Sequence, residues 1–258
     1  MTAIAQSMYM TRRHTRTLLR QPWFVAITLV QPIIWLLLFG TLFRSVTEIP
    51  GFTTSASYLD YLVPGVVVMT ALFSSGWSGM GLIDDMERGL MDRFLVAPLH
   101  RSAVIVGRLA YEALNLVVQA SIIGGLAWLL GARFEAGVGG FAVLVVAAAL
   151  LAAAFGSLSN ALALLLRQRE SVIGANTFLV LPITFLSAAF MPLALAPDWI
   201  AAVARFNPVN WAVEAGREAL TASPDPAVIV PRLIGLFALA VVSAMLATRA
   251  FRAYQRSI

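Results

Sequence analysis

The stretch from Val138 to Leu166, VGGFAVLVVAAALLAAAFGSLSNALALLL, contains no acidic or basic residue. It exceeds the roughly 20 apolar residues that cross the hydrocarbon core of a bilayer as a helix, so we expect a transmembrane helix here. The whole chain has the same character, with 60% hydrophobic residues, 12% charged residues and a mean hydropathy of +0.84 over 258 residues. These values indicate an all-α integral membrane protein.

Five further apolar stretches have the length of a membrane span: 24–43, 61–83, 109–130, 172–193 and 227–248. The chain has 18 basic and 13 acidic residues, yet only Glu112 and Arg232 fall inside the six stretches. This exclusion is expected, because a charge at the centre of the membrane costs about 2.5 to 3.5 kcal/mol. The sequence therefore predicts six transmembrane helices in a single domain, 1–258.

The arginines are distributed unevenly between the two sides of these spans. Most flank the spans on the side of the termini: Arg12, Arg13, Arg16, Arg20, Arg88, Arg93, Arg101, Arg108, Arg167, Arg169, Arg249, Arg252 and Arg256. Fewer fall on the other side: Arg44, Arg133, Arg205, Arg217 and Arg232. The positive-inside rule then places both termini in the cytoplasm. Arginine without lysine, together with much alanine, is typical of a GC-rich bacterial genome, so we expect a bacterial inner membrane.

Composition excludes several kinds of chemistry. The chain has no cysteine and two histidines, which argues against disulfides and metal sites. It has no lysine, so it cannot contain a complete Walker A loop for nucleotide phosphates. We expect no enzyme activity and no cofactor bound by this chain. The arginines flank apolar spans rather than forming one basic face, so nucleic acid is not an expected partner.

Two enzyme-like or pump-like patterns have simpler explanations. Gly76-Trp77-Ser78-Gly79 matches the GxSG pattern of rhomboid proteases, but both histidines, His14 and His100, lie outside any span. Close helix packing explains these small residues better. An ion-coupled transporter needs ionisable groups near the midplane, whereas Glu112 lies one turn after Arg108 and is explained by pairing with it.

Two segments outside the spans are predicted to be interfacial. Residues 4–22 place Arg12, Arg16 and Arg20 on one face, as in a helix on the inner leaflet; a solvated basic tail is the alternative. The stretch 192–226 contains tryptophans among charges and is broken at Asn207-Pro208. We expect two short amphipathic helices there, which serve either as an exit gate or as an interfacial anchor.

The inner loop 84–101 alternates charged and apolar residues at helical spacing. Leu90, Phe94 and Leu95 can form one apolar stripe. Glu87, Arg88 and Asp92 would then face a polar partner. A short amphipathic helix that contacts another protein is predicted, with an ordinary interfacial loop as the alternative.

The sequence resembles the membrane subunits of ABC-2 type exporters, particularly the daunorubicin-resistance type of permease. The likeness runs over nearly the whole chain and rests on these residues: Gln31-Pro32, Trp35, Phe39-Gly40, Tyr61-Leu62-Val63-Pro64-Gly65, Glu87-Arg88-Gly89, Arg93, Pro98, Arg101, Gly107-Arg108, Pro182, Phe185-Leu186-Ser187, Phe190, Pro192 and Asn207-Pro208.

The resemblance implies a homodimer, or a pair with a close relative, bound to two copies of a cytoplasmic ATPase subunit that holds ATP and Mg²⁺. It implies a cytoplasmic coupling helix and a re-entrant external helical pair. The implied ATPase-coupling residues are Asp85, Glu87, Arg88, Gly89, Arg93, Pro98 and Arg101. The second and fifth spans would line the substrate path, through Met69, Phe73, Trp77, Asn176, Phe178, Phe185 and Phe190.

The predicted function is that of the permease subunit of an ATP-driven exporter. Aromatic and methionine side chains suit hydrophobic drugs, antibiotics or lipid-like compounds, because they offer contact area without a fixed polar pattern. Alternating access would carry such compounds out of the cell. Export of a polysaccharide or glycolipid is one alternative, and a membrane scaffold without transport is another.

Overall fold

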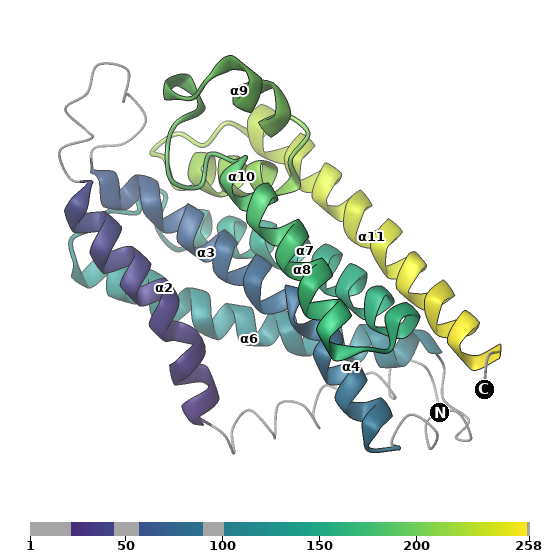
Figure 1. Cartoon of the computed structure of the whole chain (residues 1–258). Coiled ribbons are helices and arrows are strands. Elements are labelled where there is room, and N and C mark those ends of the chain that lie inside the picture. Colours follow the sequence, from purple (N-terminus) through teal and green to yellow (C-terminus); the bar gives the residue numbers. More distant parts are fainter. Residues whose placement is uncertain (1–21, 44–56, 90–100, 257–258) are drawn as a thin grey trace.

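The computed structural model describes residues 22–43, 57–89 and 101–256, and over these ranges the chain is helical with no strand (Figure 1). The elements are α2 (Pro22–Leu42), α3 (Tyr58–Gly76), α4 (Ser78–Glu87), α6 (Arg101–Leu129), α7 (Gly137–Leu166), α8 (Arg169–Phe185), a 3-10 turn (Leu193–Leu195), α9 (Asp198–Ala204), α10 (Pro208–Ala219) and α11 (Pro226–Arg256). The predicted all-α class is confirmed. The predicted helix 4–22 and residues 90–100 of the coupling segment lie outside the described residues.

Four helical stretches in the described chain are long and apolar enough to cross a membrane: Tyr58–Glu87, Leu109–Leu129, Gly137–Leu166 and Pro226–Tyr254. The chain is therefore a multi-pass membrane protein. The stretch Ile27–Leu42 is a shorter apolar helix. Helix α8 has 17 residues, which corresponds to roughly 25 Å. The first and fifth of the six expected spans thus stay predictions.

Helix α7 is the central element of the bundle. It packs against α11, α10, α3, α4 and α6, and its buried face is made mostly of small residues such as Gly140, Ala147 and Ala154. A Cβ atom at Gly140 would lie 2.0 Å from the carbonyl oxygen of Ala219 on α10. Because helices in a bilayer associate by close van der Waals packing, this small-residue face explains why α7 has so many neighbours.

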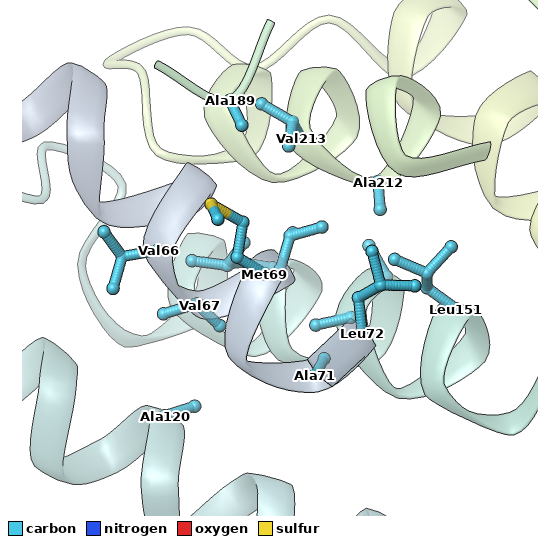
Figure 2. Close-up of a cluster of buried hydrophobic side chains, with 14 of the residues drawn as sticks. Val66, Val67, Met69, Ala71, Leu72, Ala120, Leu151, Ala189, Ala212 and Val213 are labelled. Carbon is cyan, nitrogen blue, oxygen red and sulfur yellow. The ribbon is translucent and has the colours of Figure 1, made fainter. Parts of the chain in front are cut away.

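Helix α3 is buried on every side over most of its length. Figure 2 shows Leu72 and Met69 of α3 in a cluster with Ala120 of α6, Leu151 of α7 and Val213 of α10. A helix that is apolar around its whole circumference belongs in the interior of a bundle. Helix α4 continues from α3 after one residue, Trp77, so the two form one long rod with a break.

The fifth expected span, 172–193, is not one continuous helix, because α8 ends at Phe185. The reason lies in Asn207, the N-cap residue of α10. Its Nδ2 atom donates to the carbonyls of Ile183 and Leu186, both at 2.6 Å, and its Oδ1 atom accepts from the amide of Val209 at 2.9 Å. One buried side chain thus satisfies the end of α8 and the start of α10.

The turn after α8, residues 186–192, has irregular backbone that is held by side chains from other elements. The Ala188 carbonyl accepts from the hydroxyl of Tyr61 at 2.9 Å and from Arg217 Nη2 at 3.0 Å. The Ala188 amide donates to Asn210 Oδ1 at 3.0 Å. Non-helical backbone is tolerated at membrane depth only where protein groups satisfy it, and these contacts meet that requirement.

The two short helices predicted between 192 and 226 are present as α9 and α10. The charge predicted inside the last span, Arg232 of α11, has a partner there, because its Nε atom donates to Glu214 Oε2 of α10 at 2.6 Å. The intramembrane arginine is therefore explained by an ion pair between α10 and α11. One turn before Glu214 in α10, Trp211 donates from its indole to the Arg205 carbonyl at 2.7 Å.

Candidate functional site

A cavity of about 140 Å³ lies between α2, α3 and α6. Its lining combines aromatic, aliphatic and uncharged polar side chains: Thr28, Gln31, Pro32, Trp35, Val66, Met69, Thr70, Phe73, Ser74, Trp77 and Gln119. Among these lining residues none is ionisable. A mostly apolar concave site with a few polar groups is the usual form of a site for small organic molecules.

The structure brings together the three path residues predicted in the second span, of which Met69 and Phe73 lie in α3 and Trp77 follows its last residue. Met69, Phe73 and Trp77 recur every four residues, so they lie on one face of the helix, and all three line the cavity. Their neighbours across the cavity come from α2 and α6, not from α8.

The predicted path residues of α8 lie elsewhere. Phe178 is 78% exposed and Phe185 is 62% exposed, so in the isolated chain both face outward. Asn176 lies against the break between α3 and α4, since a Cβ atom at Gly76 would be 2.6 Å from its Nδ2 atom. The assignment of these residues to a substrate path stays a prediction.

Phe190, the last predicted path residue, joins a column of aromatic rings along α2. Its ring centroid is 5.0 Å from that of Trp35 and 5.5 Å from that of Phe39. Trp35 and Phe39 stack on each other at 4.7 Å, and Phe43 continues the column. Phe190 therefore packs the turn after α8 against α2. Trp35, at one end of this column of rings, also lines the cavity.

Sequence reasoning missed the polar edge of the cavity. Gln119 is 1% exposed, and its Nε2 atom donates to Thr28 Oγ1 at 3.3 Å. Its Oε1 atom is buried and has no hydrogen-bond partner among the described residues. The sequence does indicate this residue, because Gln119 is an uncharged amide inside the apolar stretch 109–130. Counting charged residues alone does not reveal it.

The predicted coupling residues begin at the far end of α4. Arg169, the first residue of α8, donates to Asp84 Oδ1 and, at 3.2 Å, to Glu87 Oε2. These hydrogen bonds raise the pKa of Arg169 above its usual value, so it stays charged. Glu87, predicted to face a protein partner, also contacts α8 of its own chain. We call Asp84, Glu87 and Arg169 the ion cluster.

Helix α4 includes Asp85 and ends at Glu87, so the first residues of the predicted coupling segment 84–101 belong to α4. A turn follows α4 at Gly89, which has φ 63 and donates to the Met86 carbonyl, while Arg88 donates to the Asp84 carbonyl. This is the left-handed C-terminal arrangement that favours glycine.

The last three predicted coupling residues are Arg93, Pro98 and Arg101. Arg93 and Pro98 lie outside the described residues, and Arg101 is the first residue of α6. The coupling role of the whole set stays a prediction.

Glu112 lies inside the helix packing where α4, α6 and α7 meet. The hydroxyl of Ser78 donates to Glu112 Oε1, and Asn160 Nδ2 donates to Ser78 Oγ at 3.0 Å. A Cβ atom at Gly79 would lie 2.4 Å from the Ser159 carbonyl oxygen. The GxSG segment thus serves close helix packing, as the sequence indicated. Glu112 accepts a hydrogen bond from Ser78 of α4, a contact that the sequence did not indicate, and its pairing with Arg108 stays a prediction.

Comparison with known proteins shows that residues 5–221 match the ABC-2 type transporter family. The chain belongs to this family. The match covers most of the 258 residues, so it includes the helices that form the cavity and those that form the ion cluster. Both therefore lie within the ABC-2 type domain.

Two relatives of this ABC-2 type chain illustrate the range of similarity. It is 32% identical over 194 residues to the "Daunorubicin resistance ABC transporter permease protein DrrB1" of Streptomyces coeruleorubidus, over 73% of this chain and 65% of that protein. It is 24% identical over 242 residues to the "Probable doxorubicin resistance ABC transporter permease protein DrrC" of Mycobacterium tuberculosis, over 94% of this chain and 86% of that protein. The resemblance to drug-resistance permeases is therefore confirmed.

Proposed function

We propose that this chain is the permease subunit of an ATP-driven exporter of hydrophobic drugs, antibiotics or lipid-like compounds. The observation that carries the proposal is the cavity between α2, α3 and α6, in a chain of the ABC-2 type family, because its uncharged lining includes Trp35, Met69, Phe73 and Trp77. Such side chains offer area and polarisability to varied apolar cargo. The names of the relatives, which specify daunorubicin and doxorubicin resistance, agree with this class of cargo.

The energy for transport would come from a separate subunit. This chain has no lysine and therefore no complete Walker A loop, and its relatives are named as permeases of ABC transporters. We infer a complex of two permease chains, identical or closely related, with two ATPase subunits that bind ATP and Mg²⁺. Alternating access would follow from ATP binding and hydrolysis in those partners.

The predicted cytoplasmic end would receive the ATPase. It includes Glu87, Arg88 and Gly89 at the end of α4 and Arg169 at the start of α8. The excess of arginine on this side of the spans supports an inner-membrane orientation with both termini in the cytoplasm. In that orientation α9 and α10 lie at the outer surface, where tryptophans such as Trp199 suit the interface.

Transport by a reconstituted complex tests this function. The chain is co-expressed with its candidate ATPase, and doxorubicin accumulation is followed by fluorescence in inside-out vesicles. We expect accumulation that requires ATP and disappears when the phosphate-binding lysine of the ATPase is replaced. Absence of ATP-dependent accumulation for a panel of hydrophobic cationic and neutral compounds would contradict the proposal.

A matched pair of variants locates the path. Phe73→Ala enlarges the cavity, whereas Phe178→Ala alters the outward face of α8. If cargo passes through the cavity, Phe73→Ala changes the concentration for half-maximal ATPase stimulation several-fold and leaves basal hydrolysis within about two-fold. A change confined to Phe178→Ala would place the path along α8.

A further inference from the structure

The cavity between α2, α3 and α6 has two chemically different walls. One is apolar and aromatic, with Trp35, Met69 and Phe73. The other carries the amide of Gln119 beside Thr28. An occupant that satisfies both walls must have an apolar body and a polar group at one edge.

The amide of Gln119 defines the polar group. The Nε2 atom of the amide donates a hydrogen bond to Thr28 Oγ1. The Oε1 atom is buried and accepts no hydrogen bond from the described residues. A buried carbonyl-type oxygen without a hydrogen bond is costly. A hydroxyl on the occupant would relieve this cost, and it would do so even with the two amide ends exchanged, because a hydroxyl both donates and accepts.

The size of the cavity limits the apolar body. Its volume of about 140 Å³ is close to that of an engineered apolar cavity of about 150 Å³ in another protein, which binds benzene. One aromatic ring therefore fits, while a fused multi-ring system would have to leave its other rings outside. The exposed Gln31 and Trp77 line the same cavity, so the remainder of a larger molecule has a way out.

We propose that this cavity binds one uncharged, hydroxyl-bearing aromatic ring of an amphipathic compound, with the ring against Trp35, Met69 and Phe73 and the hydroxyl donating to Gln119 Oε1. The ring offers faces and edges to the aromatic wall. The absence of ionisable groups in the lining favours a neutral ring over a phenolate or an ammonium. The inference deepens the proposed export function, because it names the chemical group that the permease would hold.

Binding of two matched probes tests the inference without transport. The full chain is placed in lipid nanodiscs, and 4-fluorophenol and 4-fluoroanisole are titrated by fluorine NMR, with empty nanodiscs as the reference for partitioning into lipid. The probes share a ring and differ in the hydrogen-bond donor. We expect saturable binding of the phenol, roughly five- to ten-fold tighter than that of the anisole, as one buried hydrogen bond predicts.

Three variants assign the preference to the site. In Gln119→Leu the two probes should bind with affinities within about two-fold of each other. Asn115→Leu replaces another buried amide of α6 that does not line the cavity, and it should keep the preference. Ser74→Phe, which places a ring in the cavity, should abolish saturable binding of both probes. Size-exclusion profiles of all variants monitor folding.

Each result decides between clear alternatives. Equal affinity of the two probes for the wild type, or an unchanged preference in Gln119→Leu, would overturn the inference. Absence of saturable binding above empty nanodiscs would mean that water alone satisfies Gln119, which also overturns it. Selective binding in a chain whose complex transports nothing would overturn the export function only, whereas transport without selective binding would overturn the ring site only.

Discussion

Two arginines at opposite ends of α8 hold their neighbours in different ways. Arg169, at the start of α8, has a side chain that is 40% exposed and pairs with the exposed carboxylates of Asp84 and Glu87. Arg217 of α10, beside the turn after α8, donates to the carbonyls of Tyr61 and Ala188 at 3.2 and 3.0 Å and lies 3.5 Å over the ring of Tyr61.

The difference separates a replaceable contact from a structural one. Exposed ion pairs contribute about 0 to 1 kcal/mol and can be exchanged for water or for another protein. Buried carbonyls that lose their donors cost about 1 to 3 kcal/mol each. The ion cluster is thus suited to rearrange with a partner, whereas the end that contains Arg217 is suited to hold one arrangement.

The largest effect is expected from labelling, which tests whether the end of the molecule with Arg169 and the end with Arg217 lie on opposite sides of the membrane. The native chain has no cysteine, and Gln168 and Ser223 are both exposed. Gln168→Cys should react with an impermeant maleimide only from the cytoplasmic side, and Ser223→Cys only from outside, because of the arginine distribution. The effect is all or none. Reversed labelling in sealed vesicles of known orientation would place the ion cluster away from any cytoplasmic ATPase.

The largest expected loss of stability comes from Asn207→Ala. The change removes the donor for two carbonyls and the cap of α10, so we expect about 2 to 4 kcal/mol lower stability. Unfolding in mixed detergent micelles measures this free energy.

An ordinary cap provides the control for Asn207→Ala. Ser57→Ala removes only the acceptor for the Leu59 amide at the start of α3, which should cost about 1 kcal/mol. Equal losses in the two variants would show that the bridge from Asn207 to α8 contributes nothing.

An intermediate effect is expected for Arg217→Met, which keeps an unbranched apolar stem but removes the guanidinium group. Two charge-assisted hydrogen bonds and a cation-π contact are lost, so we expect about 1 to 3 kcal/mol lower stability. Arg205→Met serves as the control, because Arg205 is exposed and Trp211 contacts its backbone carbonyl, which the substitution keeps. A smaller loss for Arg217→Met than for Arg205→Met would contradict the assignment of a structural role.

The smallest effect on stability is expected for Arg169→Gln, at about 0 to 1 kcal/mol. If the ion cluster transmits ATPase movements, Arg169→Gln and Glu87→Ala should still lower transport per ATP hydrolysed. The exchanged pair Glu87→Arg with Arg169→Glu should then recover part of the transport. Wild-type coupling in both single variants, with normal retention of the ATPase, would leave the ion cluster as a surface pair only.

Much of the fold could be predicted from sequence, because the exclusion of charged residues from the hydrocarbon core of the membrane decides where the spans lie. The spans 138–166 and 227–248 each fall within one helix, 109–130 ends one residue beyond α6, and 61–83 covers most of α3 and part of α4. These spans could be predicted because the cost of membrane charges is read directly from composition. The early end of α8 could not be predicted. It depends on Asn207, more than twenty residues away in sequence, reaching the carbonyl of Ile183.

The candidate site was predictable only in part, for a related reason. Met69, Phe73 and the C-cap residue Trp77 recur every four residues, so their common position in the cavity follows from their spacing along α3 and its C-terminal end. Gln119 and Thr28 come from two other helices, and their meeting depends on how α2 and α6 pack against α3. Spacing along a sequence gives no information on such contacts between elements.

Because only Trp77 separates α3 from α4, a change in the angle between the two helices at Trp77 would move the whole of α4. Helix α4 has 10 residues, so it extends about 15 Å beyond Trp77, and a tilt of about 10° there displaces its tip by roughly 3 Å. The pivot residue, Trp77, lines the cavity, and the tip residue, Glu87, contacts Arg169. A displacement of this size exceeds the tolerance of a hydrogen bond. A small change in the angle between α3 and α4 at the cavity is therefore enough to form or break the contact between Glu87 and Arg169 at the end of α4.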